Sequence, residues 1–421
     1  MGKGAQQIPR MAQVGAPLVV AEKATLVAAV IPKEKLPSKK EIRDSIPEHC
    51  FQHSYVAAFA HVLRDGLVIG AFAFLAATLL RTSNLTLVDW IGWNAYAFMQ
   101  GAALTGWWVL AHECGHGGFS ASQLVNDCVG MVLHSALLVP YFAWQYSHAK
   151  HHSKTNHLMD GETHNPNTAE DVEEAGYITL AEAIGEEGFV GFQLFAHLVV
   201  GWPVYLAMNA SGARRLYNGK PIEGRVLDHY RPTSFLFPPS WRKRIFIGTC
   251  GIAVALACIA AATLKFGVVP VALFYWGPYM WVNFWLVLYT WLQHTSPDVP
   301  HYGDDEWTWV RGALCTIDRP YAECLGFFDW VHHHIGSTHV CHHLFSNLPC
   351  YHAVEATQHL KAYLKPLNLY NYDHDSLWVS MIKAARTCHY IEEPVGVQYP
   401  KPITNLFNKD GKAAPKAAKA D

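Results

Sequence analysis

Three histidine clusters constrain this chain more than any other feature, because each has the spacing of metal ligands on a helix. The first is His112-Glu113-Cys114-Gly115-His116, in which two histidines lie one helical turn apart and therefore on one face. The second and third, His148-Ala149-Lys150-His151-His152 and His339-Val340-Cys341-His342-His343, both read H-x-x-H-H and place three imidazoles at i, i+3 and i+4. The fold must therefore bring distant segments to a common site.

Together the clusters offer more ligands than one metal ion needs. The eight candidates are His112, His116, His148, His151, His152, His339, His342 and His343. A catalytic zinc ion takes three protein ligands and keeps one open position, so eight is a surplus unless two metal ions share the site. Imidazole suits iron, copper, nickel and zinc alike, and the ligand set does not choose among them. Glu113 makes the first cluster H-E-x-x-H, which alone is typical of a zinc protease with glutamate as general base.

The composition is shifted toward that of a membrane protein. Of 421 residues, 51% are hydrophobic and only 16% are charged, and 15 Trp, 19 Tyr and 20 Phe provide interfacial aromatics. The formal net charge of -2 gives no reason to expect a nucleic-acid partner. The ten cysteines contain no C-x-x-C pair, so the sequence predicts neither a zinc ribbon nor a disulfide framework.

Apolar stretches predict an all-α integral membrane protein with four transmembrane helices in two hairpins. The expected spans are residues 61–80, 87–110, 245–264 and 268–291. Two further apolar stretches, residues 124–144 and 188–208, are expected to lie in the membrane interface. If either crossed alone, the clusters on its two sides would face opposite sides of the membrane and could not share a metal centre. Both also contain polar residues, such as Asp127 and Gln193, that are costly in lipid.

Basic residues predict which side of the membrane the clusters face. The two hairpin turns carry only Arg81 and Lys265. The loop between the hairpins carries Arg214, Arg215, Lys220, Arg225, Arg231, Arg242, Lys243 and Arg244. By the positive-inside rule, both termini and a helical cap with all three clusters are expected on the cytosolic side. Residues 1–45 are expected to be a mobile tail, residues 46–400 the membrane domain and residues 401–421 a disordered tail.

The clusters resemble the three histidine boxes of membrane fatty-acyl desaturases. The sequences HECGHGGFSAS, HAKHH and HVCHH occur in that order and with those separations. Further stretches are similar to microsomal Δ12 (omega-6) oleate desaturases, namely residues 201–206, 289–295, 300–302, 307–309 and 335–339. The likeness extends from residue 46 to residue 400, which is nearly the whole chain outside the expected tails.

This resemblance implies a centre of two iron ions held by the eight box histidines and by a ninth ligand, His294, at the end of the fourth span. It implies O2 as co-substrate and a cis double bond introduced at Δ12 of oleoyl chains esterified in phospholipids. Enzymes of this kind reside in the endoplasmic reticulum membrane and receive electrons from cytochrome b5 and its NADH-dependent reductase. The chain has no cysteine set for an iron–sulfur cluster, so we expect a separate donor. Glu113 and Asp329 are candidates to orient ligand imidazoles by hydrogen bonds.

Other functions stay open from the sequence. The boxes are compatible with an omega-3 (Δ15) desaturase, a fatty-acyl hydroxylase or an acetylenase, because placement of the chain decides the product. An intramembrane zinc metalloprotease would use HECGH alone and leave six clustered histidines without a role. A membrane metal carrier would not require all boxes on one side. Metal content discriminates between these classes, since a desaturase needs two irons and a protease needs one zinc.

Overall fold

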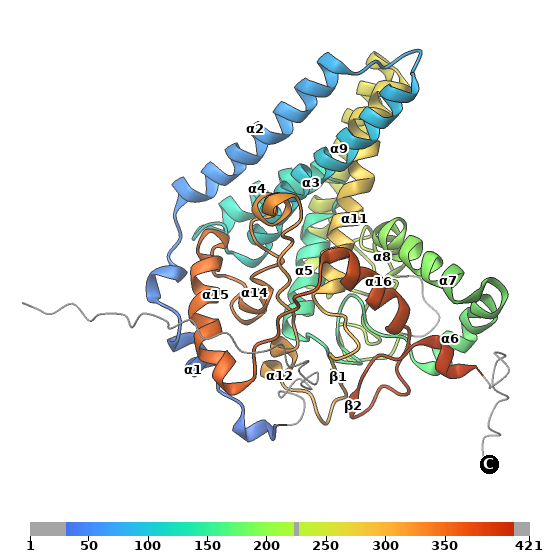
Figure 1. Ribbon diagram of the computed structural model, residues 1–421. Helices are drawn as coiled ribbons and strands as arrows, with labels where there is room; N and C mark the ends of the chain where they lie inside the picture. The colour runs from blue at the N-terminus through green and yellow to red at the C-terminus, as the bar shows by residue number, and fades with distance from the viewer. Residues whose placement is uncertain (1–30, 223–226, 408–421) are drawn as a thin grey trace, which may run out of the picture.

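The computed structural model describes residues 31–222 and 227–407, and in these ranges the chain is predominantly helical. Long helices extend to one end of the molecule, while shorter helices and a small antiparallel sheet gather at the other (Figure 1). The helices are α1 Lys39–Asp44, α2 Tyr55–Leu79, α3 Leu87–His116, α4 Gln123–Ala136, α5 Tyr141–Ser153, α6 Ala169–Glu174, α7 Tyr177–Leu198, α8 Gly201–Met208, α9 Arg242–Phe266, α10 Val268–Val271, α11 Gly277–Leu292, α12 Trp309–Leu314, α13 Phe327–Val331, α14 His339–Leu344, α15 Cys350–Leu364 and α16 Leu377–Thr387; the strands are β1 His301–Tyr302 and β2 Val397–Gln398.

The long helices coincide with the predicted spans. Helix α2 covers the first, α3 covers the second, α9 covers the third, and α10, a π-helical turn and α11 together cover the fourth. By length and apolarity, residues 55–79, 239–266 and 268–292 can each cross a membrane, and the number rises to five if each of two bent helix pairs is one span. The fold is thus that of a helical membrane protein, and the count of four spans stays a prediction.

The two stretches expected in the interface form the bent helix pairs. Helices α4 and α5 meet at 106°, and α7 and α8 meet at 59°. Between α4 and α5, Leu138 takes a φ of 55° and Pro140 precedes the first residue of α5. The bend turns α5, which carries the second histidine box, away from the line of α4.

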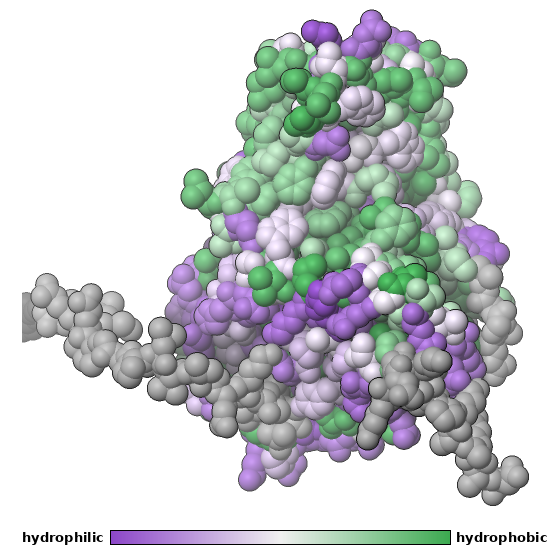
Figure 2. Space-filling view, turned by 45° about the vertical axis from the view of Figure 1, so that its right-hand side comes forward, coloured by the Kyte–Doolittle hydropathy of each residue, from purple (hydrophilic) through white to green (hydrophobic). Residues whose placement is uncertain are grey.

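Exposed apolar side chains lie along the long helices. Figure 2 shows hydrophobic residues over the upper part of the molecule and hydrophilic residues concentrated over the lower part. On α2, Val56 and Leu79 are 82% and 74% exposed, and Leu264 on α9 is 90% exposed. Continuous apolar surface of this kind is stable against lipid rather than water.

Helix α3 carries the first box into the centre of the molecule. It begins at a capping box, in which the Thr86 hydroxyl accepts the backbone N–H of Asp89 at 3.2 Å and the Asp89 carboxylate accepts that of Thr86 at 2.9 Å. It ends at His116 because Gly117 takes a φ of 76°, which terminates the helix. Between these ends α3 packs against α2, α4 and α11, so its last turns are buried.

Parts of both expected tails belong to the folded body. Helix α1 lies within residues 31–45, and Ile42 is fully buried against Ala313 and Leu344. Near the other end, Ile403 is buried in a cluster with Phe189. Residues 1–30, 223–226 and 408–421 lie outside the described residues, so the tail predictions there are untested.

Candidate metal centre

The three boxes and His294 converge on one site. The first box is the last turn of α3, the second lies in α5 and the third forms most of α14. His294 follows α11, and its backbone N–H is bonded to the carbonyl of Trp291 at 3.2 Å. Eight of the nine histidines are at most 9% exposed, and His116 is partly exposed. Four segments that are far apart in the sequence thus supply one buried set of imidazoles.

The nine imidazoles form two adjacent groups. The five-histidine group, whose ligand atoms all lie within 4.8 Å of one another, consists of His112, His116, His148, His152 and His342. The four-histidine group consists of His151, His294 and His343, which meet the same limit, together with His339, whose Nε2 lies 3.1 Å from that of His294. The groups adjoin where the rings of His152 and His343 stack with centroids 4.0 Å apart.

Helix geometry explains how each H-x-x-H-H box is divided between the groups. With about 100° of rotation per residue, positions i and i+4 lie about 40° apart, whereas i+3 is rotated by about 60° the other way. In α5, His148 and His152 accordingly enter the five-histidine group and His151 enters the four-histidine group. In α14 the assignment is reversed, since His342 joins the larger group and His339 and His343 join the smaller.

The ring nitrogens are placed as metal ligands would be. The Nε2 atoms of His148 and His152 are 3.1 Å apart, as are those of His151 and His294. Two nitrogens bound at about 2.1 Å to one ion, at nearly a right angle, are separated by about 3 Å. The Nε2 atoms of His116, His342 and His343 are buried without a hydrogen-bond partner among the described residues. The site therefore fits two metal ions.

The protonation states also suit metal binding. Burial lowers the pKa of His151 to about 4 and that of His339 to about 3. Both imidazoles are therefore neutral near pH 7, and the neutral ring is the form that binds metal ions.

Oxygen atoms orient several ligand rings through Nδ1. The Glu113 carboxylate lies 3.1 Å from Nδ1 of His112, which is the contact predicted for an orienting group. The backbone carbonyl of Glu162 accepts a hydrogen bond from Nδ1 of His151 at 2.7 Å. The Thr155 hydroxyl lies 3.0 Å from Nδ1 of His343. Each contact leaves Nε2 of the ring facing the centre.

Asp329 has different neighbours from those expected of an orienting group. In the described part of the chain, its carboxylate accepts hydrogen bonds from Nδ1 of His334 at 2.7 Å and from the Ser337 hydroxyl at 2.9 Å. Neither partner is one of the nine histidines, although Ser337 directly precedes the third box. The structure thus places Glu113 against one of the nine histidines and Asp329 against residues outside that set.

A cavity of about 420 Å³ lies beside the five-histidine group. Helices α7, α8 and α11 contribute to its wall, which includes His148, Trp202, Tyr205, Leu286 and Trp291. Polar side chains such as Asn165, Gln193 and Thr290 also line it, so the cavity combines aromatic and aliphatic walls with polar groups. Such a cavity, reaching a histidine of the five-histidine group, can accommodate an apolar chain.

Fold and site together define a class of protein, namely a membrane metalloenzyme whose histidine-rich centre lies where α3 and α11 end. The chain belongs to the fatty acid desaturase family, which it matches over residues 89–374. It is 40% identical to the Δ(12) fatty acid desaturase of Mortierella isabellina, covering 84% of this chain and 88% of that relative. Identity is 38% with the oleoyl-12-hydroxylase of Ricinus communis, over 85% and 87% of the two chains. The chain is 37% identical to the protein of Brassica juncea named "Omega-6 fatty acid desaturase, endoplasmic reticulum". The match covers 84% of this chain and 87% of that relative.

Family membership confirms the resemblance predicted from the three boxes. The protein is an oxidoreductase that acts on fatty acyl chains. The zinc-protease interpretation of HECGH has no support, because His112 and His116 share their group with three histidines from the other two boxes.

Proposed function

We propose that this enzyme introduces a cis double bond at Δ12 of oleoyl chains esterified in phospholipids, giving linoleoyl chains, with two iron ions bound by the nine histidines. The observation that carries the proposal is the division of the imidazoles into two adjacent groups beside a cavity with aromatic and aliphatic side chains in its wall. Relatives named as Δ12 desaturases, 37–40% identical over most of the chain, give the regiochemistry. Per turnover, the acyl chain loses two hydrogens, and O2 takes up these together with two electrons and two protons to form two water molecules.

The residues of this chain would bind and position the substrate. Iron held in the two groups would supply the activation of O2 that an unactivated C–H bond requires. Leu286 and Val287 on α11 and Trp202 on α8 line the cavity and would hold the apolar chain while excluding water. The Trp144 ring stacks on that of His148 with centroids 4.6 Å apart, and both residues line the cavity. Packing of this kind would fix how close a given carbon comes to the five-histidine group.

Hydroxylation is the second candidate function, because the Ricinus communis relative is named an oleoyl-12-hydroxylase and is 38% identical. Both reactions begin with removal of hydrogen from the same region of an oleoyl chain. The position of the chain in the cavity would then decide whether a second hydrogen is removed or oxygen is inserted. An omega-3 (Δ15) outcome would require the chain to lie further along the same cavity.

Electrons would come from cytochrome b5 and its NADH-dependent reductase. The ten cysteines are all free and scattered, which gives the chain no iron–sulfur cluster of its own. The name of the Brassica juncea relative supports an endoplasmic reticulum membrane. Arg215 of the basic loop lies next to the second box, since its carbonyl accepts a hydrogen bond from Lys150 at 3.1 Å. This contact puts the second box on the same side as the basic loop, which supports a cytosolic position for the boxes. We propose four spans, with both termini on that side.

Expression in a yeast without Δ12 activity tests the proposal. Gas chromatography of total fatty-acid methyl esters should show linoleate in cells that carry the enzyme, and none in cells that carry His148→Ala. His359→Ala is the matched control, because His359 is exposed on α15 and lies outside both groups. A hydroxylated or Δ15 product would be consistent with the proposed metal centre but would change the assigned specificity. Absence of any new product from membrane-inserted, iron-loaded protein would contradict the proposal.

A further inference from the structure

Trp307 connects the molecular surface to the four-histidine group. Its indole Nε1 donates a hydrogen bond to the backbone carbonyl of Thr155 at 2.9 Å. The hydroxyl of the same threonine lies 3.0 Å from Nδ1 of His343. Trp307 is partly exposed, whereas Thr155 and His343 are each only 2% exposed. The Trp307 ring at the surface is therefore joined to the buried His343 imidazole by two hydrogen bonds and by the covalent bonds of Thr155.

We propose that Trp307 is the entry point for electrons from the donor protein, and that they travel through Thr155 to His343. This inference rests on the proposed function, which needs two electrons per turnover from a separate one-electron donor. Electron tunnelling weakens less steeply through covalent and hydrogen bonds than across gaps. Each donor haem would be oxidised from ferrous to ferric while one ferric ion of the centre is reduced to ferrous.

The direction of the hydrogen bonds places the end of this route at a ligand atom. The Thr155 hydroxyl also lies 3.0 Å from the carbonyl of His151, which can only accept. The hydroxyl therefore donates to that carbonyl and accepts from Nδ1–H of His343. With Nδ1 protonated, Nε2 of His343 is the free lone pair, and this atom has no hydrogen-bond partner among the described residues.

Close packing protects the bond between Trp307 and Thr155. Gly312 in α12 lies against it, and a Cβ at this position would be 2.2 Å from the Thr155 carbonyl oxygen and 3.0 Å from the Trp307 Nε1. Any side chain at residue 312 would push the two partners apart. The glycine thus lets α12 cover the bond, which keeps water from competing for it.

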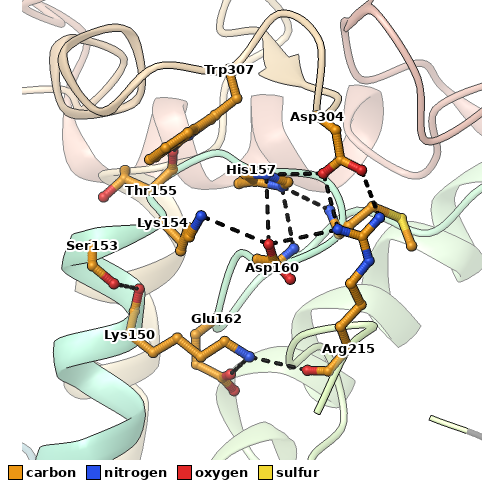
Figure 3. Close-up of polar contacts among 11 residues, drawn as sticks. Lys150, Ser153, Lys154, Thr155, His157, Asp160, Glu162, Arg215, Asp304 and Trp307 are labelled. Carbon is orange, nitrogen blue, oxygen red and sulfur yellow. Dashed lines mark hydrogen bonds and ion pairs between the residues drawn. The ribbon is translucent and has the colours of Figure 1, made fainter. Parts of the chain in front are cut away.

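Charged residues lie beside the partly exposed ring, as Figure 3 shows. The Lys154 ammonium lies 4.7 Å from the Trp307 ring centroid, and the His157 ring lies 5.2 Å away. Asp304 is paired with Arg215 at 2.6 Å. His157, Asp160 and Asp304 lie close enough to bind a cation, but Arg215 and Lys154 already compensate the two carboxylates. A polar, charge-balanced surface around one aromatic ring suits the small, transient interfaces of electron-transfer partners.

Anaerobic stopped-flow mixing of ferrous cytochrome b5 with the ferric enzyme in nanodiscs tests the route, because haem absorbance reports electron transfer without turnover. We expect Trp307→Ala to slow haem oxidation by about tenfold or more, and Trp307→Phe, which keeps the ring and loses the donor, to slow it less. Iron per chain and reduction by dithionite should not change. Trp309→Phe is the matched control, because Trp309 lies two residues further on, beneath Lys39, and packs against the Ile42 cluster.

Three results would overturn the inference. Haem oxidation within about twofold of the parent rate in Trp307→Ala would show that electrons enter elsewhere. If reduction of Trp307→Ala were slowed equally with dithionite and with the cytochrome, Trp307 would have a structural role at the centre instead. Loss of iron from either Trp307 variant would lead to the same conclusion. Failure of the proposed function is recognised separately, since the unmodified enzyme would then lack iron or form no product with dithionite, and both proposals would fall.

Discussion

His294 faces His151 with their Nε2 atoms 3.1 Å apart, although 143 residues separate them in the chain. His294 lies equally close to His339, so it stands between ligands from the second and third boxes. We expect His294→Ala to lower bound iron from about two ions per chain to about one, because the four-histidine group would lose its central ligand. Formation of linoleate by this variant should be lost as well. Iron analysis of the purified protein measures the effect, with His359→Ala as control, and two irons retained in His294→Ala would rule out the ligand role.

The contact of Glu113 with His112 predicts an effect on metal affinity. Glu113 is 2% exposed, and its carboxylate is within hydrogen-bond distance of Nδ1 of His112, while Nδ1 of His342 lies further away at 3.8 Å. Glu113→Ala should weaken iron retention by about 10–100-fold, as is usual when the group that orients a ligand histidine is removed. Competition with graded chelator concentrations provides the measurement. Glu113→Gln keeps an accepting oxygen and should lose less iron than Glu113→Ala. Equal iron retention in the parent protein and both variants would contradict the orienting role.

Metal exchange should separate stability from activity. Removing iron with a chelator is expected to lower the thermal midpoint, because bound ions stabilise the folded state over the unfolded one. Iron(II) should restore both the midpoint and desaturation. Zinc(II) fits the imidazole ligands and should raise the midpoint, but it has no redox chemistry and should give no product. Desaturation by the zinc-loaded protein would refute the di-iron assignment.

A buried carboxylate in α2 predicts a change in stability. Asp65 is fully buried, and its carboxylate lies 2.7 Å from Nε2 of the buried His333 and 2.6 Å from the partly exposed Arg64 guanidinium. Asp65→Ala should lower the free energy of unfolding by about 1–3 kcal/mol, because Nε2 of the buried His333 loses its hydrogen-bond acceptor. Thermal unfolding in detergent measures this. Asp65→Asn keeps a hydrogen-bond acceptor of the same shape and should lose less, and an unchanged midpoint in the alanine variant would disprove the contribution.

The clustering of the box histidines could be predicted because their spacing is a local property of a helix. Residues at i, i+3 and i+4 meet on one side whatever the rest of the fold does, so both H-x-x-H-H boxes were recognisable without a structure. His294 has no such local pattern, and only the family resemblance pointed to it. The four long helices were also predictable within a few residues, because apolar length is read directly from the sequence.

The contacts between boxes could not be predicted in the same way. Thr155 lies just beyond the end of α5, four residues after His151, and its hydroxyl lies 3.0 Å from the His151 carbonyl. Its contact with His343 depends on how α5 packs against α14, which no local pattern reports. The same holds for α1, because its charged sequence resembles a tail while the burial of Ile42 is decided by residues almost three hundred positions away.

The interleaving of the boxes has a consequence for the distance between the two metal ions. Helices α5 and α14 each carry histidines of both groups, separated by one residue's rotation of about 100° between i+3 and i+4. The spacing of two ions bound in these groups would therefore be set by backbone hydrogen bonds within two helices rather than by the segments that join them. A substitution that unwinds a single turn of α5 or α14 would displace histidines of both groups, and both metal positions would change together.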